Sequence, residues 1–194
     1  MLDSYGRKYI NPIILKLAKL FVQIKISANV VTTLALIIGI LSAVFLYFSM
    51  PILSLIFLWV SGYLDSVDGT IARLTNSTSP YGTLMDITFD RLVETGIILV
   101  TALNHPDVAF YLLLLTVTIL ISMTIFLTVG ALAKNNGFKS FKYQIGLAER
   151  TEGFIMFSAM ILFQSHLKLI ISLFLVMMLI TIYQRFAEGL RILK

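Results

Sequence analysis

Long apolar runs separated by short polar segments dominate this sequence. The runs lie near residues 28–49, 51–64, 92–104, 108–133, 153–163 and 167–183. A helix needs about 20 mostly apolar residues to cross the hydrocarbon core of a bilayer, so the shorter runs reach that length only with their polar flanks. The second run then extends to about residue 74. This pattern predicts an all-α integral membrane protein with six transmembrane helices.

A different pattern precedes the first run. Between residues 11 and 26, apolar residues recur at helical spacing opposite Lys16, Lys19 and Gln23, which is typical of an amphipathic helix. Asn11-Pro12 resembles a helix start, with asparagine as the cap and proline in the first turn. We therefore expect residues 1–26 to form a cytoplasmic amphipathic segment, a juxtamembrane helix on the membrane surface, and residues 27–194 to form one six-helix domain.

The composition agrees with a membrane protein. Of 194 residues, 58% are hydrophobic and only 13% are charged, whereas soluble domains carry about 25% charged residues. The mean hydropathy is +0.94. There is no cysteine, which excludes disulfides, thiolate metal ligands and thiol nucleophiles. Any catalysis must therefore use oxygen and nitrogen groups.

Basic residues are distributed asymmetrically along the predicted spans. In a six-span arrangement, every lysine and arginine except Lys168 falls on one side. The positive-inside rule then places both termini, and the polar segment around residues 65–90, on the cytoplasmic side of the membrane. The net charge of +5 reflects this topology and attraction to membrane lipid, and no separate basic arm indicates nucleic acid as a partner.

Four aspartates interrupt the hydrophobic pattern. Each unpaired aspartate in mid-membrane costs roughly 2.5 to 3.5 kcal/mol, so four would cost on the order of 10 kcal/mol. On a helix, Asp65 and Asp68 share one face, and so do Asp86 and Asp90. The short connection between the two helices predicts antiparallel neighbours. Two facing acidic stripes would form an oxygen-ligand site suited to a divalent cation such as Mg²⁺, Mn²⁺ or Ca²⁺.

The same segment contains a spaced motif. It reads Asp-x2-Asp-Gly-x2-Ala-Arg-x8-Gly-x3-Asp-x3-Asp from Asp65 to Asp90. This motif resembles the signature of the CDP-alcohol phosphotransferase family, also called CDP-alcohol phosphatidyltransferases, at all eight fixed positions, in the manner of small bacterial members. Asn29 and Thr32 resemble the family's Pro-Asn-x-x-Thr element, although Ala28 stands in place of the proline. The family's six-helix architecture would cover essentially the whole chain.

The resemblance implies a reaction and a set of site residues. A CDP-linked donor, usually CDP-diacylglycerol, would transfer its substituted phosphoryl group to a small polar alcohol or phosphorylated alcohol, with release of CMP. Two divalent ions, Mg²⁺ or Mn²⁺, would be held by Asp65, Asp68, Asp86 and Asp90. Asp90 would also act as the general base. The residues implied for the donor nucleotide pocket are Asn29, Thr32, Gly69, Ala72, Arg73 and Gly82. The family also implies a homodimer.

Several residues keep two interpretations. Lys134, Arg150 and Arg191 could grip the phosphate of a phosphorylated acceptor, but positive-inside topology alone would also supply them. Asn29 could cap the first span or contact the donor. Two further alternatives concern Arg91, which either braces the acidic site or extends to the surface, and Glu94, which either belongs to the acidic stripe or pairs helices.

Other functions remain possible on the sequence alone. Within the family, a small CDP-alcohol such as CDP-choline could be the donor and a lipid the acceptor. From other classes, intramembrane carboxylates also occur in divalent-cation transporters, and the chain could be a non-catalytic membrane scaffold. Gly69, Arg73 and Gly82 argue against the last two, because ion coordination alone needs no nucleotide-sized gap beside an anion partner. The sequence does not specify the acceptor, its phosphorylation or the acyl preference.

Overall fold

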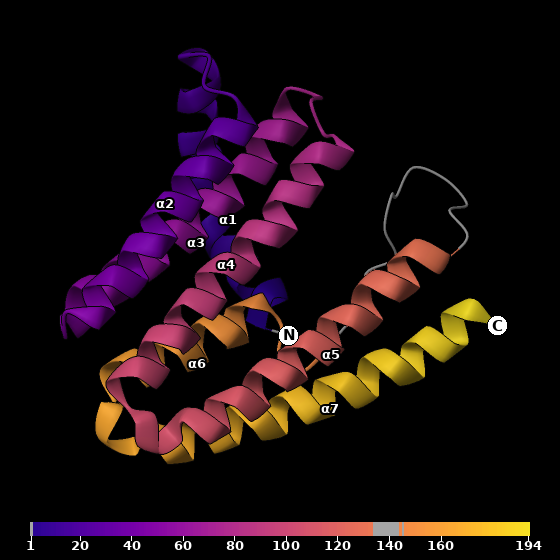
Figure 1. Ribbon diagram of the computed structural model, residues 1–194. Helices are drawn as coiled ribbons and strands as arrows, with labels where there is room; N and C mark the ends of the chain where they lie inside the picture. Colours follow the sequence, from indigo (N-terminus) through magenta and orange to yellow (C-terminus); the bar gives the residue numbers. More distant parts are fainter. Residues whose placement is uncertain (1, 134–143, 145) are drawn as a thin grey trace. The chain divides into compact units, whose positions relative to one another are not determined.

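The structure, a computed structural model, describes residues 2–133, 144 and 146–194, with side chains described from residue 11 onward. Within these residues all regular elements are helical, as the sequence predicts. Internal contacts group the chain into two compact units, Leu2–Pro106 and the part that begins at Asp107 (Figure 1). Each unit is described by itself.

The first unit contains four helices. They are α1 (Leu2–Gln23), α2 (Ala28–Tyr47), α3 (Pro51–Leu74) and α4 (Pro80–Asn104). The ends of α2 and α3 fall within three residues of the predicted boundaries, because Pro51 is compatible with a first helical turn and cannot continue α2. The helix α2 packs extensively against both α3 and α4, an arrangement that the short connection between α3 and α4 did not predict.

Two buried hydrogen bonds tie α2 to α3. The Ser42 hydroxyl donates to the carbonyl of Ser54 at 2.7 Å, and the Ser61 hydroxyl donates to the carbonyl of Ala35 at 2.7 Å. Position 42 therefore pairs with 54 and position 35 with 61, so the helices are antiparallel. Small hydroxyl residues allow backbones in a membrane protein to approach closely and add a bond between the helices.

The contact between α2 and α4 has the opposite direction. Gly39 lies against Val93, and Gly96 lies beside Ala43. Further along both helices, the Asn104 amide donates to the carbonyl of Leu46 at 3.0 Å. Residue numbers rise together on the two helices, so α2 and α4 are parallel, and α3 runs antiparallel to both.

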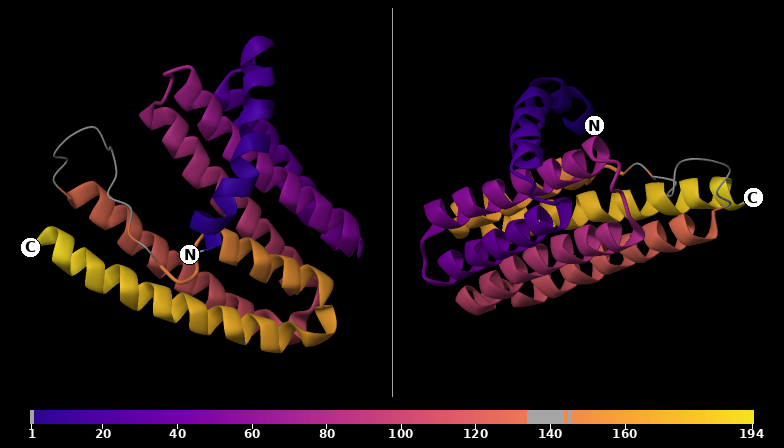
Figure 2. Two further views of the ribbon diagram at one scale, coloured as in Figure 1. Left: turned by 180° about the vertical axis from the view of Figure 1, so that it is seen from behind. Right: turned by 90° about the horizontal axis from the view of Figure 1, so that it is seen from above.

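The amphipathic helix α1 packs on α3 (Figure 2). Its Ile14 and Ala18 are buried in a core cluster with Val67 of α3, whereas Lys16 and Lys19 are exposed. The face of α1 that packs on α3 is thus apolar, and these two lysines lie away from it.

The predicted start of this helix at Asn11-Pro12 is wrong. The helix α1 begins at Leu2 and contains Pro12 in its interior. Proline lacks the backbone N–H and crowds the preceding turn, but its fixed φ is itself helical, so a helix can continue through it at the cost of one hydrogen bond.

The second unit contains α5 (Ala109–Leu132), α6 (Arg150–Leu162) and α7 (Leu167–Leu193). The helices α5 and α7 lie side by side and run in the same direction (Figures 1 and 2). Single-turn 3₁₀ helices at Pro106–Val108 and Gln164–His166 precede α5 and α7. They occupy the predicted turns between the apolar runs.

Four helical segments have the length and composition of membrane spans. They are Ala28–Tyr47, Pro51–Leu74, Pro106–Leu132 and Gln164–Leu193. The predicted number of six is not reached by these criteria in the described part of the chain. Among the remaining helices, α4 carries the charged residues of the acidic segment, and α6 has only 13 residues.

Candidate metal and donor site

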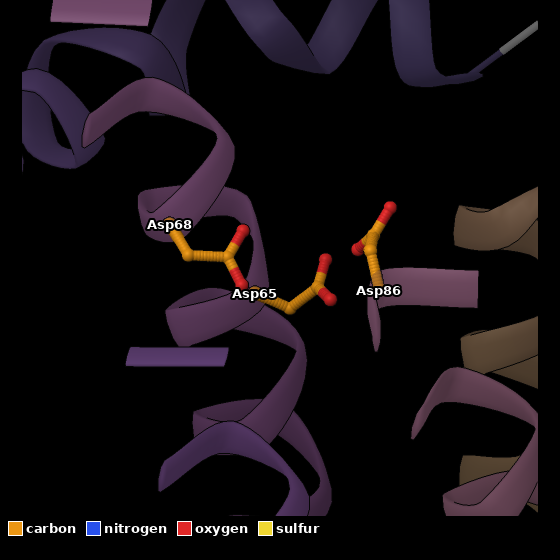
Figure 3. Close-up of side chains that lie close together, drawn as sticks. All are labelled: Asp65, Asp68 and Asp86. Atoms are coloured by element: carbon orange, nitrogen blue, oxygen red, sulfur yellow. The ribbon is translucent and has the colours of Figure 1, made fainter. Parts of the chain in front are cut away.

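Three of the four aspartates meet in the first unit. Asp65 and Asp68 lie on α3 and Asp86 on α4, and one carboxylate oxygen from each lies within 4.8 Å of the other two. Figure 3 shows Asp86 facing the other two carboxyl groups across a short gap. Asp65 and Asp68 are only 8% and 5% exposed, and Asp86 is half-buried. The structure therefore brings together three of the four aspartates that the sequence singles out.

Local structure fixes where Asp86 lies. Residues 75–79 form the connection, and Asn76 has a φ of 52°, a conformation that asparagine tolerates better than most residues. Ser79 then caps α4, because its hydroxyl accepts a hydrogen bond from the Gly82 N–H at 3.0 Å. Pro80 occupies the first turn. Asp86 consequently projects from the second turn of α4, toward α3.

The donor set suits a divalent cation. Three ionised carboxylates at this separation repel one another, and burial of two of them strengthens the repulsion. Carboxylate oxygens are hard ligands that favour Mg²⁺, Ca²⁺ or Mn²⁺. Asp65, Asp68 and Asp86 therefore fit the metal that the motif implies.

Asp90 lies one turn beyond Asp86 on α4 and is half-buried. It does not belong to the group of three described carboxylates whose oxygens lie within 4.8 Å of one another. Beside it, the Arg91 guanidinium forms an ion pair with Glu94. Arg91 and Glu94 therefore bind each other along one helix. This contact bears on both of the alternatives left open for them, because it is made within α4.

The residues expected around the donor lie on the same unit as the acidic cluster. Gly69 and Ala72 are half-buried on α3. Arg73 is exposed and its guanidinium donates to the Thr70 hydroxyl at 3.0 Å, so it folds back along its own helix. A Cβ on Gly69 would lie 3.4 Å from Nη1 of Arg73, which shows how closely the guanidinium passes this glycine.

Asn29 and Gly82, far apart in the sequence, lie close together. A Cβ on Gly82 would be 3.5 Å from Oδ1 of Asn29. The interpretation of Asn29 as a helix cap is wrong, because Ser27 is the N-cap of α2 and Asn29 lies inside the helix. Thr32, one turn further, is buried, and its hydroxyl donates to the Ala28 carbonyl at 3.0 Å.

The candidate acceptor residues belong to the second unit. Arg150 is the first residue of α6, is half-buried, and lies over the ring of Phe154 at 6.0 Å from the centroid. Arg191 is exposed near the end of α7. Lys134 lies outside the described residues. The structure thus places two of the three on one unit, without showing a shared site.

Sequence reasoning missed the side chains that hold the start of α6. The N–H of Leu147 donates to Oε1 of Gln184 at 2.7 Å, and that of Ala148 donates to the Thr181 hydroxyl at 2.8 Å. Both acceptors lie on α7. The only available signal was the polar pair within an apolar helix. These bonds fix the segment that precedes Arg150.

Sequence patterns indicate Arg185 only as a topology signal and miss its contacts in the fold. It is 8% exposed, its Nη1 donates to the Ser122 hydroxyl at 2.9 Å, and its guanidinium lies 5.0 Å from the centroid of the Phe126 ring. A buried arginine must satisfy its charge locally. It therefore joins α7 to α5.

Comparison with known proteins gives the same picture. The chain matches the family described as CDP-alcohol phosphatidyltransferase over residues 25–186. The archaetidylinositol phosphate synthase of Pyrococcus horikoshii is 32% identical over 102 residues, covering 51% of this chain and 54% of that protein. The bifunctional IPC transferase and DIPP synthase of Archaeoglobus fulgidus is 33% identical over 85 residues, covering 44% of this chain and 17% of that protein. The alignments thus cover about half or less of these relatives.

Solved structures share the fold. The phosphatidylinositol phosphate synthase of Mycobacterium tuberculosis with CDP-DAG bound superposes with a TM-score of 0.73 at 20% identity, covering 92% of this chain and 94% of that one. The same enzyme in complex with manganese and citrate gives a TM-score of 0.72 at 20% identity, covering 91% and 88%. At this identity the likeness establishes the fold.

Proposed function

This chain belongs to the CDP-alcohol phosphatidyltransferase family, and from this premise we propose that it transfers a phosphatidyl group from CDP-diacylglycerol to a polar alcohol in phospholipid synthesis. The observation that carries the proposal is the meeting of Asp65, Asp68 and Asp86 within 4.8 Å beside the glycines of the family motif. A cation transporter would need the carboxylates but not Gly69 or Gly82.

Asp65, Asp68 and Asp86 would hold the metal, Mg²⁺ or Mn²⁺ in one or two ions. When bound, the metal supplies positive charge that stabilises the pyrophosphate and the departing CMP. Gly69, Ala72 and Gly82 leave space for the nucleotide, and Asn29 contributes an amide at its edge. Arg73, which is exposed, can turn from Thr70 to a donor phosphate.

Asp90 is the proposed general base. It lies one turn from Asp86 on α4, and it would accept the proton of the acceptor hydroxyl. The hydroxyl oxygen then forms a bond to the phosphatidyl phosphorus, and the bond from that phosphorus to the bridging oxygen breaks. CMP leaves with the bridging oxygen. Such proton transfer contributes typically 10² to 10⁴ in rate.

The proposed acceptor is a phosphorylated polyol. The named relatives from Pyrococcus and Mycobacterium are inositol phosphate lipid synthases, and a phosphate on the acceptor would give Arg150 and Arg191 a ligand. Arg150 opens α6, where backbone N–H groups also favour an anion. Lys134, outside the described residues, is the third proposed contact.

The remaining features of the proposal concern the membrane. We propose six spans, with α4 and α6 added to the four apolar segments, because Asp86 of α4 belongs to the acidic cluster, Arg91 and Glu94 form an ion pair, and α6 would be extended by its polar flanks. Residues 1–26 would lie on the cytoplasmic surface and residues 27–194 would form the catalytic domain. Both termini and the active site face the cytoplasm, and the protein is a homodimer.

Release of CMP tests the proposed function. Purified protein is incubated with CDP-diacylglycerol, Mg²⁺ or Mn²⁺, and one acceptor at a time from serine, inositol, inositol phosphate, glycerol phosphate and choline. We expect a phosphorylated polyol to stimulate release most. CDP-choline with diacylglycerol is the control for the reverse donor arrangement. CMP release by that pair alone would contradict the proposal.

Metal binding is expected to stabilise the fold, since it relieves repulsion among the three clustered aspartates. At a metal concentration 100 times the dissociation constant, linkage gives about 2.7 kcal/mol. Thermal unfolding in detergent with Mg²⁺ and with EDTA measures the effect. An Asp65→Asn/Asp68→Asn variant is the control and should lose most of the shift. An equal shift in both proteins would show that the metal binds elsewhere.

A further inference from the structure

Gly39 of α2 lies in close contact with two other helices, α3 and α4. A Cβ built on Gly39 would lie 2.3 Å from Cγ2 and 2.9 Å from Cγ1 of Val93 on α4, and 2.8 Å from the Ser61 hydroxyl oxygen on α3. Gly39 and Ser61 are buried, and Val93 is 7% exposed. Only hydrogen fits at this position without movement of a neighbour.

Both contacts continue the acidic stripes of the metal site. Ser61 precedes Asp65 by four residues and therefore lies on the same face of α3, one turn away. Val93 follows Asp86 by seven residues, two turns along the same face of α4. Gly39 thus touches α3 and α4 on the faces that carry the metal-site carboxylates.

An added methyl group at Gly39 would displace α4 more readily than α3. The helix α3 is fixed to α2 by the bonds from Ser42 to Ser54 and from Ser61 to Ala35, both 2.7 Å long. Near Gly39, α4 meets α2 through side-chain packing. Val93 cannot easily rotate away, because both of its methyl groups face the glycine and helical valine adopts one rotamer in about 90% of cases.

The displacement would be large on the scale of a metal site. A separation of 2.3 Å is more than about 1 Å short of ordinary carbon–carbon contact, whereas metal–ligand distances tolerate only about 0.2 Å. Since Asp86 is on the helix that moves, its oxygen would leave the group formed with Asp65 and Asp68. We propose that Gly39 is a positioning residue that sets the separation of α3 and α4, and thereby the metal-binding geometry. This inference rests on the proposed metal site.

Binding of Mn²⁺ alone, followed by the EPR signal of the free ion, tests this proposal. The matched control is Gly96→Ala, the same change at the same helix pair, where the new Cβ would lie 3.4 Å from the Cβ of Ala43, an ordinary contact. Gly39→Ala/Val93→Ala removes the opposing methyl groups. Unfolding of each metal-free protein reports whether the fold itself is retained.

We expect Gly39→Ala to weaken Mn²⁺ binding about tenfold or more, in the range seen when residues that orient metal ligands are changed. Gly96→Ala should bind Mn²⁺ with an affinity within about twofold of wild type, because a substitution that meets no steric conflict has little effect. The double variant should recover part of the loss, because the close contact with the Ser61 hydroxyl oxygen at 2.8 Å remains. A folded Gly39→Ala protein with wild-type Mn²⁺ affinity would overturn the proposal, as would a double variant no better than Gly39→Ala.

Two other outcomes are distinguishable. Wild-type protein that binds no Mn²⁺ would overturn the metal site itself and this inference with it. If Gly39→Ala does not fold, Val93→Ile enlarges the same contact from α4, with Val44→Ile on the exposed face of α2 as its control. Equal Mn²⁺ affinity in these two variants would overturn the positioning role.

Discussion

Replacing Asp90 by asparagine is expected to lower kcat by about 10² to 10⁴ while Mn²⁺ and CDP-diacylglycerol still bind. The amide cannot accept the hydroxyl proton, whereas Asp65, Asp68 and Asp86, which lie within 4.8 Å of one another, remain intact. Single-turnover CMP release gives the chemical rate, and equilibrium binding gives the two affinities.

Asp68→Asn is the matched control for this variant. Asp68 belongs to the group of three, so its loss should weaken binding of Mn²⁺ and, through the metal, of the donor nucleotide. The two variants therefore separate turnover from binding. General-base catalysis contributes at least about 10² in rate. If Asp90→Asn keeps more than about a tenth of the wild-type rate, the loss of rate is smaller than this, and the assignment of Asp90 as the base is wrong.

Arg150→Ala is expected to reduce kcat/KM for a phosphorylated acceptor by about 10- to 150-fold, equivalent to roughly 1.5 to 3 kcal/mol for a lost hydrogen bond to a charged group. The KM for CDP-diacylglycerol should not change. Arg150→Lys should restore only part of the activity, because lysine cannot form the bidentate contact.

Lys168→Ala is a suitable control, since Lys168 lies over the ring of Tyr111 in a segment predicted to be on the opposite side of the membrane. It should leave acceptor kinetics unchanged. An unchanged kcat/KM for Arg150→Ala with the acceptor identified by CMP release would remove the phosphate contact from the proposed function, and Arg150 would then be a topology signal.

Much of this molecule could be predicted from local patterns. The periodicity of apolar residues predicted the existence of the helices from α2 to α7, because burying apolar surface is the main force that acts on such segments. The polar ends of two of them were missed: α4 begins at Pro80, well before its apolar run, and α7 continues to Leu193, well past its run. The spacing of Asp65, Asp68 and Asp86 predicted their convergence, since side chains three or four positions apart share a helix face. The family followed from the same residues.

Features that depend on contacts between helices were missed. The residue type favours Asn29 as a cap, but Ser27 is the N-cap of α2 and Asn29 lies beside Gly82. The helix α1 passes through Pro12, which looked like a start. In both cases the residue type favours one local structure, and its neighbours in the fold decide whether that structure forms.

The sequence by itself determined the helical elements, the acidic cluster on α3 and α4, and the membership of the family. Only the tertiary structure decided that α2 lies against both α3 and α4, that Gly39 meets Val93 and Ser61, and that Arg185 joins α7 to α5. The physical reason is range. Hydrogen bonding and side-chain direction within a helix depend on residues four positions apart, whereas close packing depends on the shapes of surfaces that the chain brings together from distant positions.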